Sequence, residues 1–239
     1  MPPRVTWPLV TWPRRRPVDP SRYPAGPVHD LAAAPPADAG TPFHELELLS
    51  VDLETTGLDV RRDHVLAVGW VPVRAGEVVL AEAVDTVVRP PTGVVVGTSA
   101  TIHGLTDDAV AAAPTLEDVL PDLLAALHGR VLLAHHAPIE LGFLERAARS
   151  AYGSSLPLTA VDTLALQQEL VTGEHGEVRP GLLRLDDARR LYGLPRYQSH
   201  RALTDAIATG ELLLAQVAEL TERRGRPVLL RDLRPVRRR

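Results

Sequence analysis

The sequence predicts an α/β protein in which helices flank a mixed central sheet of five strands. Two observations support this prediction. Short apolar runs with strand character begin at Leu46, and apolar residues at helical spacing follow from about residue 116 onward. Successive strands followed by helices that alternate with strands are typical of a mixed sheet covered by helices.

Three consecutive strands are expected first. LELLSVDL (46–53) is a short apolar run typical of a buried strand, and a turn follows it at 55–57. HVLAVGWVPV (64–73) and EVVLAEAVDTVV (77–88) are further strand-like runs. Residues 74–76 between them predict a hairpin turn.

Apolar spacing then changes to that of helices. Residues 116–127 predict a helix with Thr115 as its N-cap and a bend at Pro121. VLLAH (131–135) predicts a fourth strand, and PIELGFLERAARSAY (138–152) predicts the next helix.

The last elements complete the alternation. AVDTL (160–164) predicts the fifth strand or the start of the following helix. LDDARRLYG predicts a short helix that Gly193 ends, and a long final helix is expected from about Ala202 to Arg223.

The composition favours one domain with two tails. At 239 residues and 45% hydrophobic content, the chain can bury a core of ordinary size. We expect that domain over 46–222. Residues 1–45 are rich in proline and arginine, and we expect them to be extended or disordered because they lack helical or strand periodicity. Residues 223–239 form an arginine-rich tail.

Charge is distributed unevenly between the domain and the tail. Residues 46–222 hold 13 Arg against 25 Asp and Glu, whereas residues 223–239 hold 8 Arg against the single Asp232. Two interpretations of the tail remain open. It is a solvated, frayed terminus, or it contacts nucleic-acid phosphates, which arginine suits by its geometry and permanent charge.

The chain contains no cysteine, which excludes disulfides and thiolate metal sites. Any metal must therefore be held by oxygen or imidazole. The sequence contains no run of 18 apolar residues and no export signal of the usual kind. We expect a cytoplasmic protein with no membrane partner.

Asp52 and Glu54 in SVDLETTG predict a cation site. Residues two apart in a strand point to the same face, so both carboxylates project together at the end of the first strand. Two like charges side by side are costly unless a cation lies between them.

Four segments together resemble the DEDDh exonucleases, the DnaQ-like family that includes proofreading subunits. They are DLETTGL (52–58), IHGLTDD (102–108), AHHAPIELGFL (134–144) and HRALTDA (200–206), and the resemblance covers roughly 46–222. It implies a ribonuclease H-like fold. It also implies a metal-dependent 3′-to-5′ exonuclease that hydrolyses terminal phosphodiesters and releases nucleoside 5′-monophosphates.

The resemblance assigns roles to individual residues. Asp52 corresponds to the ligand that bridges two divalent cations, Mg²⁺ or Mn²⁺, and Glu54 to a ligand of one of them. Asp205 corresponds to the third-motif ligand, and His200 to the general base that takes a proton from water. Five residues on a helix turn through about 500°, so we expect His200 in the loop before the helix that carries Asp205.

Glu140 departs from the family pattern, which has Asp at the corresponding metal-ligating position. The extra methylene moves the carboxylate by about 1.5 Å. This shift leaves two possibilities open: Glu140 is a catalytic metal ligand in an altered position, or it is a surface residue beside an impaired site. His136 stands where the family has Asn, in a chain that contains no Asn.

The same resemblance points to residues that contact the terminal nucleotide. The residues expected to bind substrate are Thr55, Thr56, Gly57, Leu58, Ile102, His103 and His136.

Asp162 matches a recurrent aspartate of the family. We expect it to cap the helix that starts at Thr163 rather than to bind metal.

The expected partner is the 3′ end of nucleic acid, with single-stranded DNA favoured, and an unseen polymerase or repair protein is a possible further partner. Two rival functions remain. One is a 3′-to-5′ exoribonuclease of the same fold, and the other is a catalytically impaired module that binds nucleic acid or protein.

Overall fold

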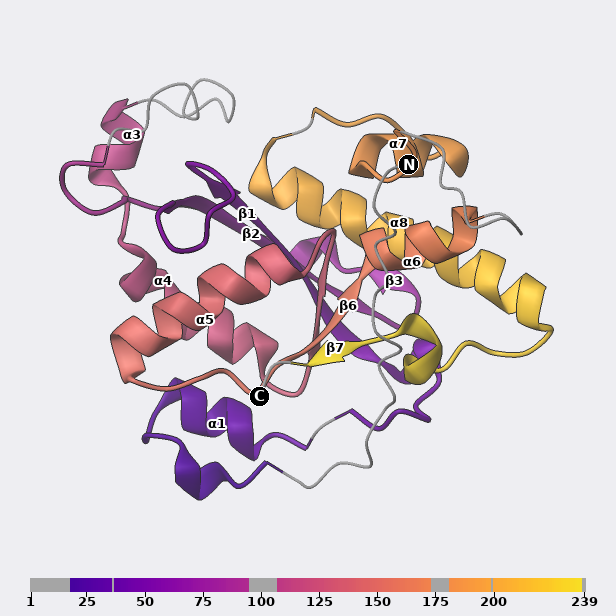
Figure 1. The fold of residues 1–239 in the computed structure, drawn as a ribbon, viewed down its shortest axis with the longest axis horizontal. Coiled ribbons are helices and arrows are strands. Elements are labelled where there is room, and N and C mark those ends of the chain that lie inside the picture. Colours follow the sequence, from indigo (N-terminus) through magenta and orange to yellow (C-terminus); the bar gives the residue numbers. More distant parts are fainter. Residues whose placement is uncertain (1–17, 36, 95–106, 173–180, 199, 238–239) are drawn as a thin grey trace, which may run out of the picture.

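A mixed seven-stranded sheet lies at the centre of the part of the chain that the computed structural model describes, namely residues 18–35, 37–94, 107–172, 181–198 and 200–237. The strand order is β3-β2-β1-β5-β6-β7, and β4 also pairs with β2 (Figure 1). Helices flank the sheet. The predicted α/β fold class is therefore confirmed.

Three neighbouring strands of the sheet run parallel, so their carboxyl ends lie at one edge of the sheet. The first strand, β1 (Glu47–Thr55), pairs antiparallel with β2 (Val65–Arg74) and parallel with β5 (Val131–Ala134). The next strand, β6 (Thr159–Asp162), runs parallel to β5. The carboxyl ends of β1, β5 and β6 consequently lie at the same edge.

The predicted number of five strands was too low. The third expected strand is divided into β3 (Glu77–Val78) and β4 (Val84–Val87) by the 3-10 helix η3 (Leu80–Glu82). The division lies beside Pro72 of β2, whose backbone cannot donate a hydrogen bond to a neighbouring strand. Residues of the tail add β7 (Val236–Arg237), which pairs with β6.

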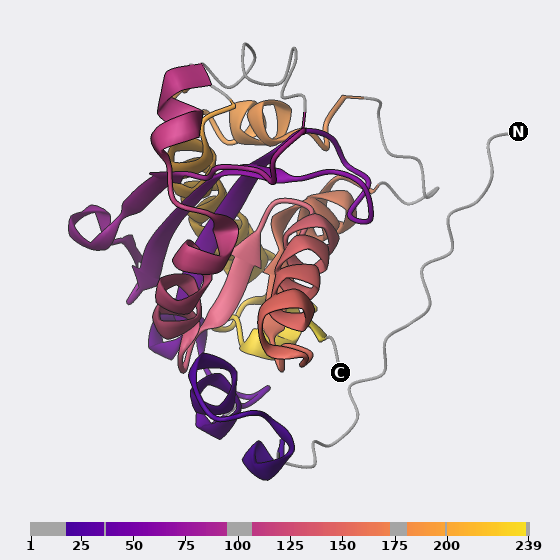
Figure 2. The same ribbon diagram turned by 90° about the vertical axis from the view of Figure 1, so that its left-hand side faces the viewer.

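Helices lie on both sides of the sheet (Figure 2), and the buried apolar side chains fall into two clusters. The first cluster includes residues of α1 (Pro27–Ala33), α4 (Leu116–Leu127) and α5 (Pro138–Tyr152). The second includes residues of α6 (Thr163–Val171) and α8 (Ala202–Arg224).

Shorter elements complete the described chain. They are η1 (Pro20–Arg22), η2 (Phe43–Glu45), α3 (Asp107–Ala112), α7 (Leu185–Leu191), which packs on α8, and η4 (Leu230–Leu233). None of the described helices is long and apolar enough to cross a membrane.

Helix boundaries follow the local signals of the sequence. Thr115 caps α4 in a capping box with Asp118, and Asp162 caps α6 by accepting hydrogen bonds from the backbone of Leu164 and Ala165. Both predicted caps are confirmed. Gly225 ends α8 in the left-handed conformation that glycine adopts without strain.

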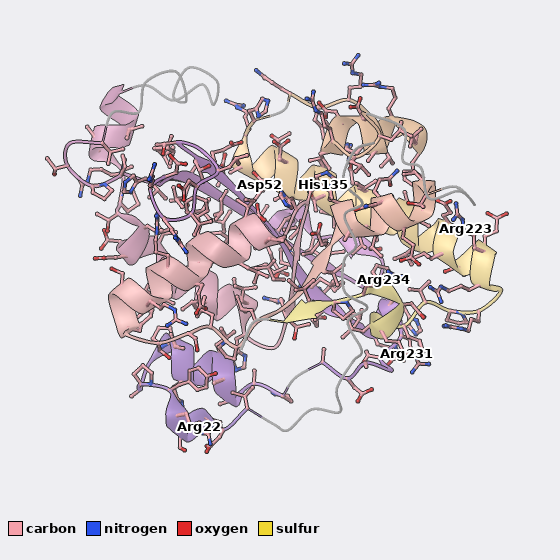
Figure 3. The ribbon with its side chains drawn as sticks, viewed as in Figure 1. Arg22, Asp52, His135, Arg223, Arg231 and Arg234 are labelled. Carbon is pink, nitrogen blue, oxygen red and sulfur yellow. The ribbon has the colours of Figure 1, made fainter. Side chains whose placement is uncertain are left out.

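Parts of both predicted tails are folded. Helix α1 lies within residues expected to be extended or disordered, and its Val28 and Leu31 join the first cluster. At the other terminus, Val228, Leu230 and Leu233 join the second cluster. The described tail residues are therefore not frayed, because short apolar segments bury themselves against the domain. The labelled arginines of this terminus lie apart from Asp52 (Figure 3).

Candidate active site

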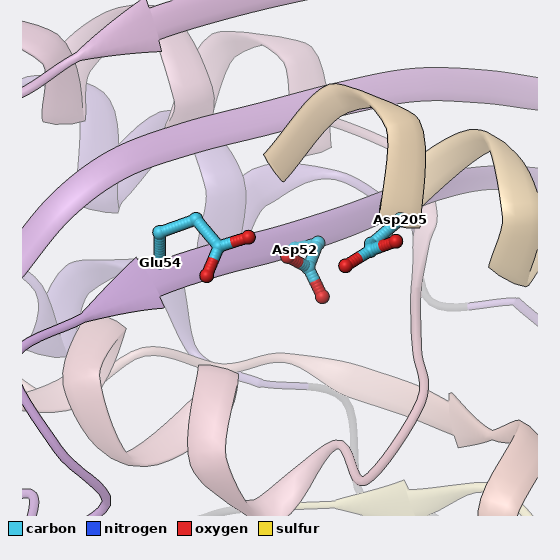
Figure 4. A group of neighbouring side chains, drawn as sticks. All are labelled: Asp52, Glu54 and Asp205. Atoms are coloured by element: carbon cyan, nitrogen blue, oxygen red, sulfur yellow. The ribbon is translucent and has the colours of Figure 1, made fainter. Parts of the chain in front are cut away.

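Three carboxylates meet at the sheet edge where β1 ends. One oxygen each from Asp52, Glu54 and Asp205 lies within 4.8 Å of the others (Figure 4). Asp52 and Glu54 come from the same face of β1, and Asp205 comes from the first turn of α8. Residues more than 150 positions apart in the chain thus form one acidic group.

The first turn of α8 reaches this group because it lies directly on the sheet. Gly69 of β2 is the register partner of Asp52. A Cβ atom on Gly69 would lie 2.1 Å from the backbone nitrogen of Leu203, so only glycine permits this approach. Ser50 adds a second attachment, since its hydroxyl donates to the carbonyl of Ala206 at 2.7 Å. Neither Gly69 nor Ser50 was predicted from the sequence to belong to the site.

His200 lies in the loop before α8, as the helical geometry predicted. Its backbone nitrogen donates to Oδ2 of Asp205 at 2.9 Å. Its φ of 67° is in the left-handed region, which non-glycine residues seldom adopt. This exposed histidine is therefore tied through its backbone to one of the three acids.

The environment of the acids opposes their ionisation. Burial raises the pKa of Asp52 well above its ordinary value, and the charges of Glu140, Asp205 and Glu54 raise it further. Burial, with the charge of Asp205, raises the pKa of Glu54 to about 7. Burial also raises the pKa of Asp205, although the hydrogen bond from His200 and the charge of His200 act in the opposite direction.

Glu140 lies near this group but outside it. It occupies the first turn of α5, with only 4% of the residue exposed, which contradicts the interpretation as a surface residue. Its Oε2 has no hydrogen-bond partner among the described residues. Burial raises the pKa of Glu140 to about 8, partly offset by its own backbone, and its charge acts on Asp52.

A divalent cation suits this set of donors. The side chains offer carboxylate oxygens, which Mg²⁺ and Mn²⁺ prefer. A cation would offset the mutual repulsion of the clustered acids, and the unpartnered Oε2 of Glu140 would be a ligand for it. The residues present therefore fit a metal centre.

The loop after β1 has a defined conformation. Thr55 donates its hydroxyl proton to the carbonyl of Gly57 at 2.7 Å, and Thr56 donates to Oδ1 of Asp63 at 3.0 Å. A Cβ atom on Gly57 would lie 2.5 Å from the Asp63 carboxylate. Leu58 follows with 73% of the residue exposed. The loop thus presents an apolar side chain to solvent beside the acids.

Helix α5 packs against this loop and holds it in place. Arg146 donates hydrogen bonds to the carbonyls of Val60 and Asp63, and its guanidinium lies over the ring of Phe143. A Cβ atom on Gly142 would lie 2.7 Å from Val60, so the loop packs closely on the helix. This role of Arg146 could not be predicted from the sequence, because a helical arginine is ordinarily a solvated side chain.

His136 follows the end of β5, on the same edge. Its φ is 80°, and its backbone nitrogen donates to Oδ1 of Asp162 at 2.9 Å. Asp162 thereby joins the loop after β5 to the start of α6. The neighbouring His135 is half-buried between the Thr163 hydroxyl and the carbonyl of Leu183, with a ring nitrogen 2.8 Å from each. Ile102 and His103 lie outside the described residues.

Comparison with known proteins places these features in a family. Residues 49–213 match the sequence profile of the family described as Exonuclease. A PolC-type DNA polymerase III of Thermotoga petrophila is 28% identical over 172 residues, which are 72% of this chain and 12% of that protein. A DNA polymerase III subunit epsilon-like protein of Rhodobacter capsulatus is 31% identical over 186 residues, which are 77% of this chain and 26% of that protein.

Solved structures share the fold. Exonuclease X in complex with 5′ overhanging duplex DNA superimposes with a TM-score of 0.54 and 24% identity, over 72% of this chain and 92% of that one. A 3′-exonuclease that recognises the histone mRNA stem-loop gives a TM-score of 0.58 and 15% identity, over 76% of this chain and 66% of that one. The chain spans only a small part of its polymerase relatives, but its match over 49–213 shows that it belongs to the exonuclease family.

Proposed function

We propose that this protein is a metal-dependent 3′-to-5′ exonuclease that releases nucleoside 5′-monophosphates from the ends of nucleic acid. The convergence of Asp52, Glu54 and Asp205 carries the proposal. A protein that only bound nucleic acid would have no need of a cluster of acids whose ionisation the fold opposes.

Two divalent cations, Mg²⁺ or Mn²⁺, are part of the proposal. Asp52, Glu54 and Asp205 would hold one, and Asp52 with Glu140 the other. Bound there, such cations would supply polarisation of the terminal phosphodiester and would favour ionisation of the attacking water.

The side chains of the chain itself perform the remaining tasks. His200 takes the proton of the attacking water, and the bond from its backbone to Asp205 keeps it beside the acids. Thr55, Thr56 and Gly57 hold the loop so that Leu58 can stack on the terminal base. His136 lies at the edge where the next nucleotide would pass.

Single-stranded DNA is the substrate that we favour. Among the similar proteins, the polymerase names and the complex of Exonuclease X with DNA support DNA, whereas the histone mRNA exonuclease supports the rival of an exoribonuclease. A polymerase or repair partner belongs to the same proposal. So does a cytoplasmic location, which the absence of cysteine favours.

Degradation of end-labelled DNA and RNA of matched sequence, with Mg²⁺, Mn²⁺ or EDTA, tests the proposal. We expect loss from the 3′ end, nucleoside 5′-monophosphate products and no reaction in EDTA. His200→Ala and Asp205→Ala should each lower kcat by about 10²–10⁴-fold, and Glu140→Ala should also lower it. Asp122→Ala, an exposed acid of α4, serves as the control.

Binding of nucleic acid without metal-dependent turnover would support the rival non-catalytic module. Faster degradation of RNA than of DNA would support the exoribonuclease. Unchanged turnover in Glu140→Ala would remove Glu140 from the site.

A further inference from the structure

A fully buried arginine lies between α7 and α8. The Arg189 side chain is only 2% exposed. Its Nη1 donates to the carbonyl of Ala208 at 2.6 Å. Its Nη2 donates to the carbonyl of Pro195 at 2.9 Å and to Oε2 of Glu211 at 2.8 Å. The guanidinium thereby joins the loop after α7 to the side of α8.

Tyr197 strengthens the same junction. Its ring centre lies 4.6 Å from the central carbon of the Arg189 guanidinium, a distance at which cation–π attraction operates. Its hydroxyl donates to Oε1 of Glu211 at 2.8 Å. Residues 195–197 are therefore attached to α8 through Arg189 and Glu211 together.

This attachment lies directly before His200 in the chain. His200 is itself bonded through its backbone to Asp205, in the first turn of the helix to which Arg189 is attached. Tyr197 and His200, three positions apart in the sequence, are thus each attached to α8. The left-handed backbone of His200 is a strained conformation for a non-glycine residue, and such a conformation persists only where its surroundings enforce it.

Stability alone gives little reason for a charge at this place. Burying an ion pair brings a desolvation penalty that its own attraction often fails to offset, and apolar side chains of similar volume are often as stable. A guanidinium does offer several donors in a fixed plane, which fixes the positions of several acceptors at once.

We propose that Arg189 is a positioning residue, which fixes residues 195–197 against α8 so that His200 stands beside Asp205 and the other acids. The inference rests on the proposed function, in which His200 is the general base. Arg189 itself touches neither the substrate nor the reacting atoms.

Hydrogen exchange tests the positioning without reference to activity. In Arg189→Met, the amide of His200 should exchange at least about 10-fold faster, because its bond to Asp205 opens more often. Arg190→Met is the matched control, since Arg190 lies on the same helix but is exposed and pairs with Asp187. Unchanged exchange in Arg189→Met would overturn the proposal, whether or not the protein is a nuclease.

Kinetics test the consequence for turnover. Arg189→Met should lower kcat by about 10–100-fold with little change in KM, since a displacement of about 1 Å can cost 10²-fold. Its Mn²⁺ affinity should stay within about threefold, because the carboxylates remain in place. In the His200→Ala background, Arg189→Met should cause almost no further loss.

A purely structural role would give other results. In Arg189→Met, thermal stability would fall while kcat of the folded protein stayed normal. Alternatively, the fold-losses in kcat caused by Arg189→Met and by His200→Ala would multiply in the variant that carries both. If Arg189→Met does not fold, Tyr197→Phe provides the same comparison with a milder change, because it removes only the bond to Glu211. It should accelerate exchange at His200 and lower kcat by about 2–5-fold, and normal values of both would reject the proposal.

Discussion

Burial of acids at the site links the stability of the protein to pH. The pKa of Glu54 rises from 4.5 to about 7, and that of Glu140 from 4.5 to about 8, chiefly because both are buried. At pH values between its ordinary pKa and its raised pKa, each carboxyl binds more protons in the folded protein than in the unfolded chain. The free energy of unfolding without metal should therefore fall as pH rises from about 4.5 to about 8, and the loss is complete above that range.

Divalent cations should reverse this loss, because they bind the ionised carboxylates. We expect Mn²⁺ to raise the thermal midpoint by about 4–8 °C more at pH 8.5 than at pH 6. Thermal unfolding in EDTA and in Mn²⁺ at the two pH values measures the difference. The double variant Glu54→Gln, Glu140→Gln is the control, and its Mn²⁺-induced rise in thermal midpoint should differ little between the two pH values. An equal effect at both pH values would contradict the assignment of these carboxyls to the cation site.

At single residues, the sequence predicted side-chain chemistry better than side-chain surroundings. The spacing of Asp52 and Glu54 sufficed to place both on one face, because strand alternation is strict. The burial of Glu140 could not be read, since it depends on how α5 packs against the sheet. The left-handed conformation of His136 could not be predicted either, because the hydrogen bond from its backbone nitrogen to Asp162 forms only in the folded protein.

At the scale of elements, the distance between α8 and β2 determines whether the acids can meet. The helix begins directly over Gly69, whose register partner is Asp52. Any side chain at this position would lift the first turn of α8, which carries Asp205. The geometry of the acidic group therefore depends on Gly69, because glycine has no side chain that would separate α8 from β2.

Gly69→Ala should damage both stability and turnover. Its Cβ would lie 2.1 Å from the backbone nitrogen of Leu203, and backbone cannot yield as a flexible side chain does. We expect a loss of about 1–3 kcal/mol in the free energy of unfolding and about a 10²-fold fall in kcat. Urea unfolding and steady-state kinetics measure the two effects.

Gly210→Ala is the matched control for this prediction. Gly210 lies farther along α8, where a Cβ would meet only the side-chain methyls of Val73 and Val78 at 3.1 Å. We expect a change within about 1 kcal/mol, because helix propensity offsets the crowding, and normal kcat. If Gly69→Ala behaved as Gly210→Ala does, close approach at Gly69 would not be what positions Asp205.

Elements with strong local signals were predicted well. The hairpin turn at 74–76, the caps at Thr115 and Asp162 and the extent of α8 all follow from residues close together in sequence. Helix α1 and β7 were missed, because short segments become regular only through contacts with distant parts of the chain.

Across the whole molecule, the basic tail pairs with acids of the protein itself. Arg226 donates to both oxygens of Asp232, at 2.7 and 2.9 Å, and Arg234 lies 2.6 Å from Glu169. Arg223 similarly pairs with Glu219. The contrast between acidic domain and basic tail is therefore partly balanced within the fold. Contact between the tail and nucleic-acid phosphates stays a prediction, and it would occur away from Asp52 (Figure 3).

We expect the folding unit to extend beyond the domain over 46–222 expected from the sequence and to include α1 and η4, whose apolar side chains join the two clusters. Leu230 is fully buried in the second cluster. Leu230→Ala should therefore lower the free energy of unfolding by about 2–4 kcal/mol, measured by urea unfolding, while kcat of the folded protein stays normal because the site lies elsewhere. Leu191→Ala, at a residue 52% exposed, should have almost no effect. Equal midpoints for the two variants would mean that the tail is dispensable and that the domain ends with α8.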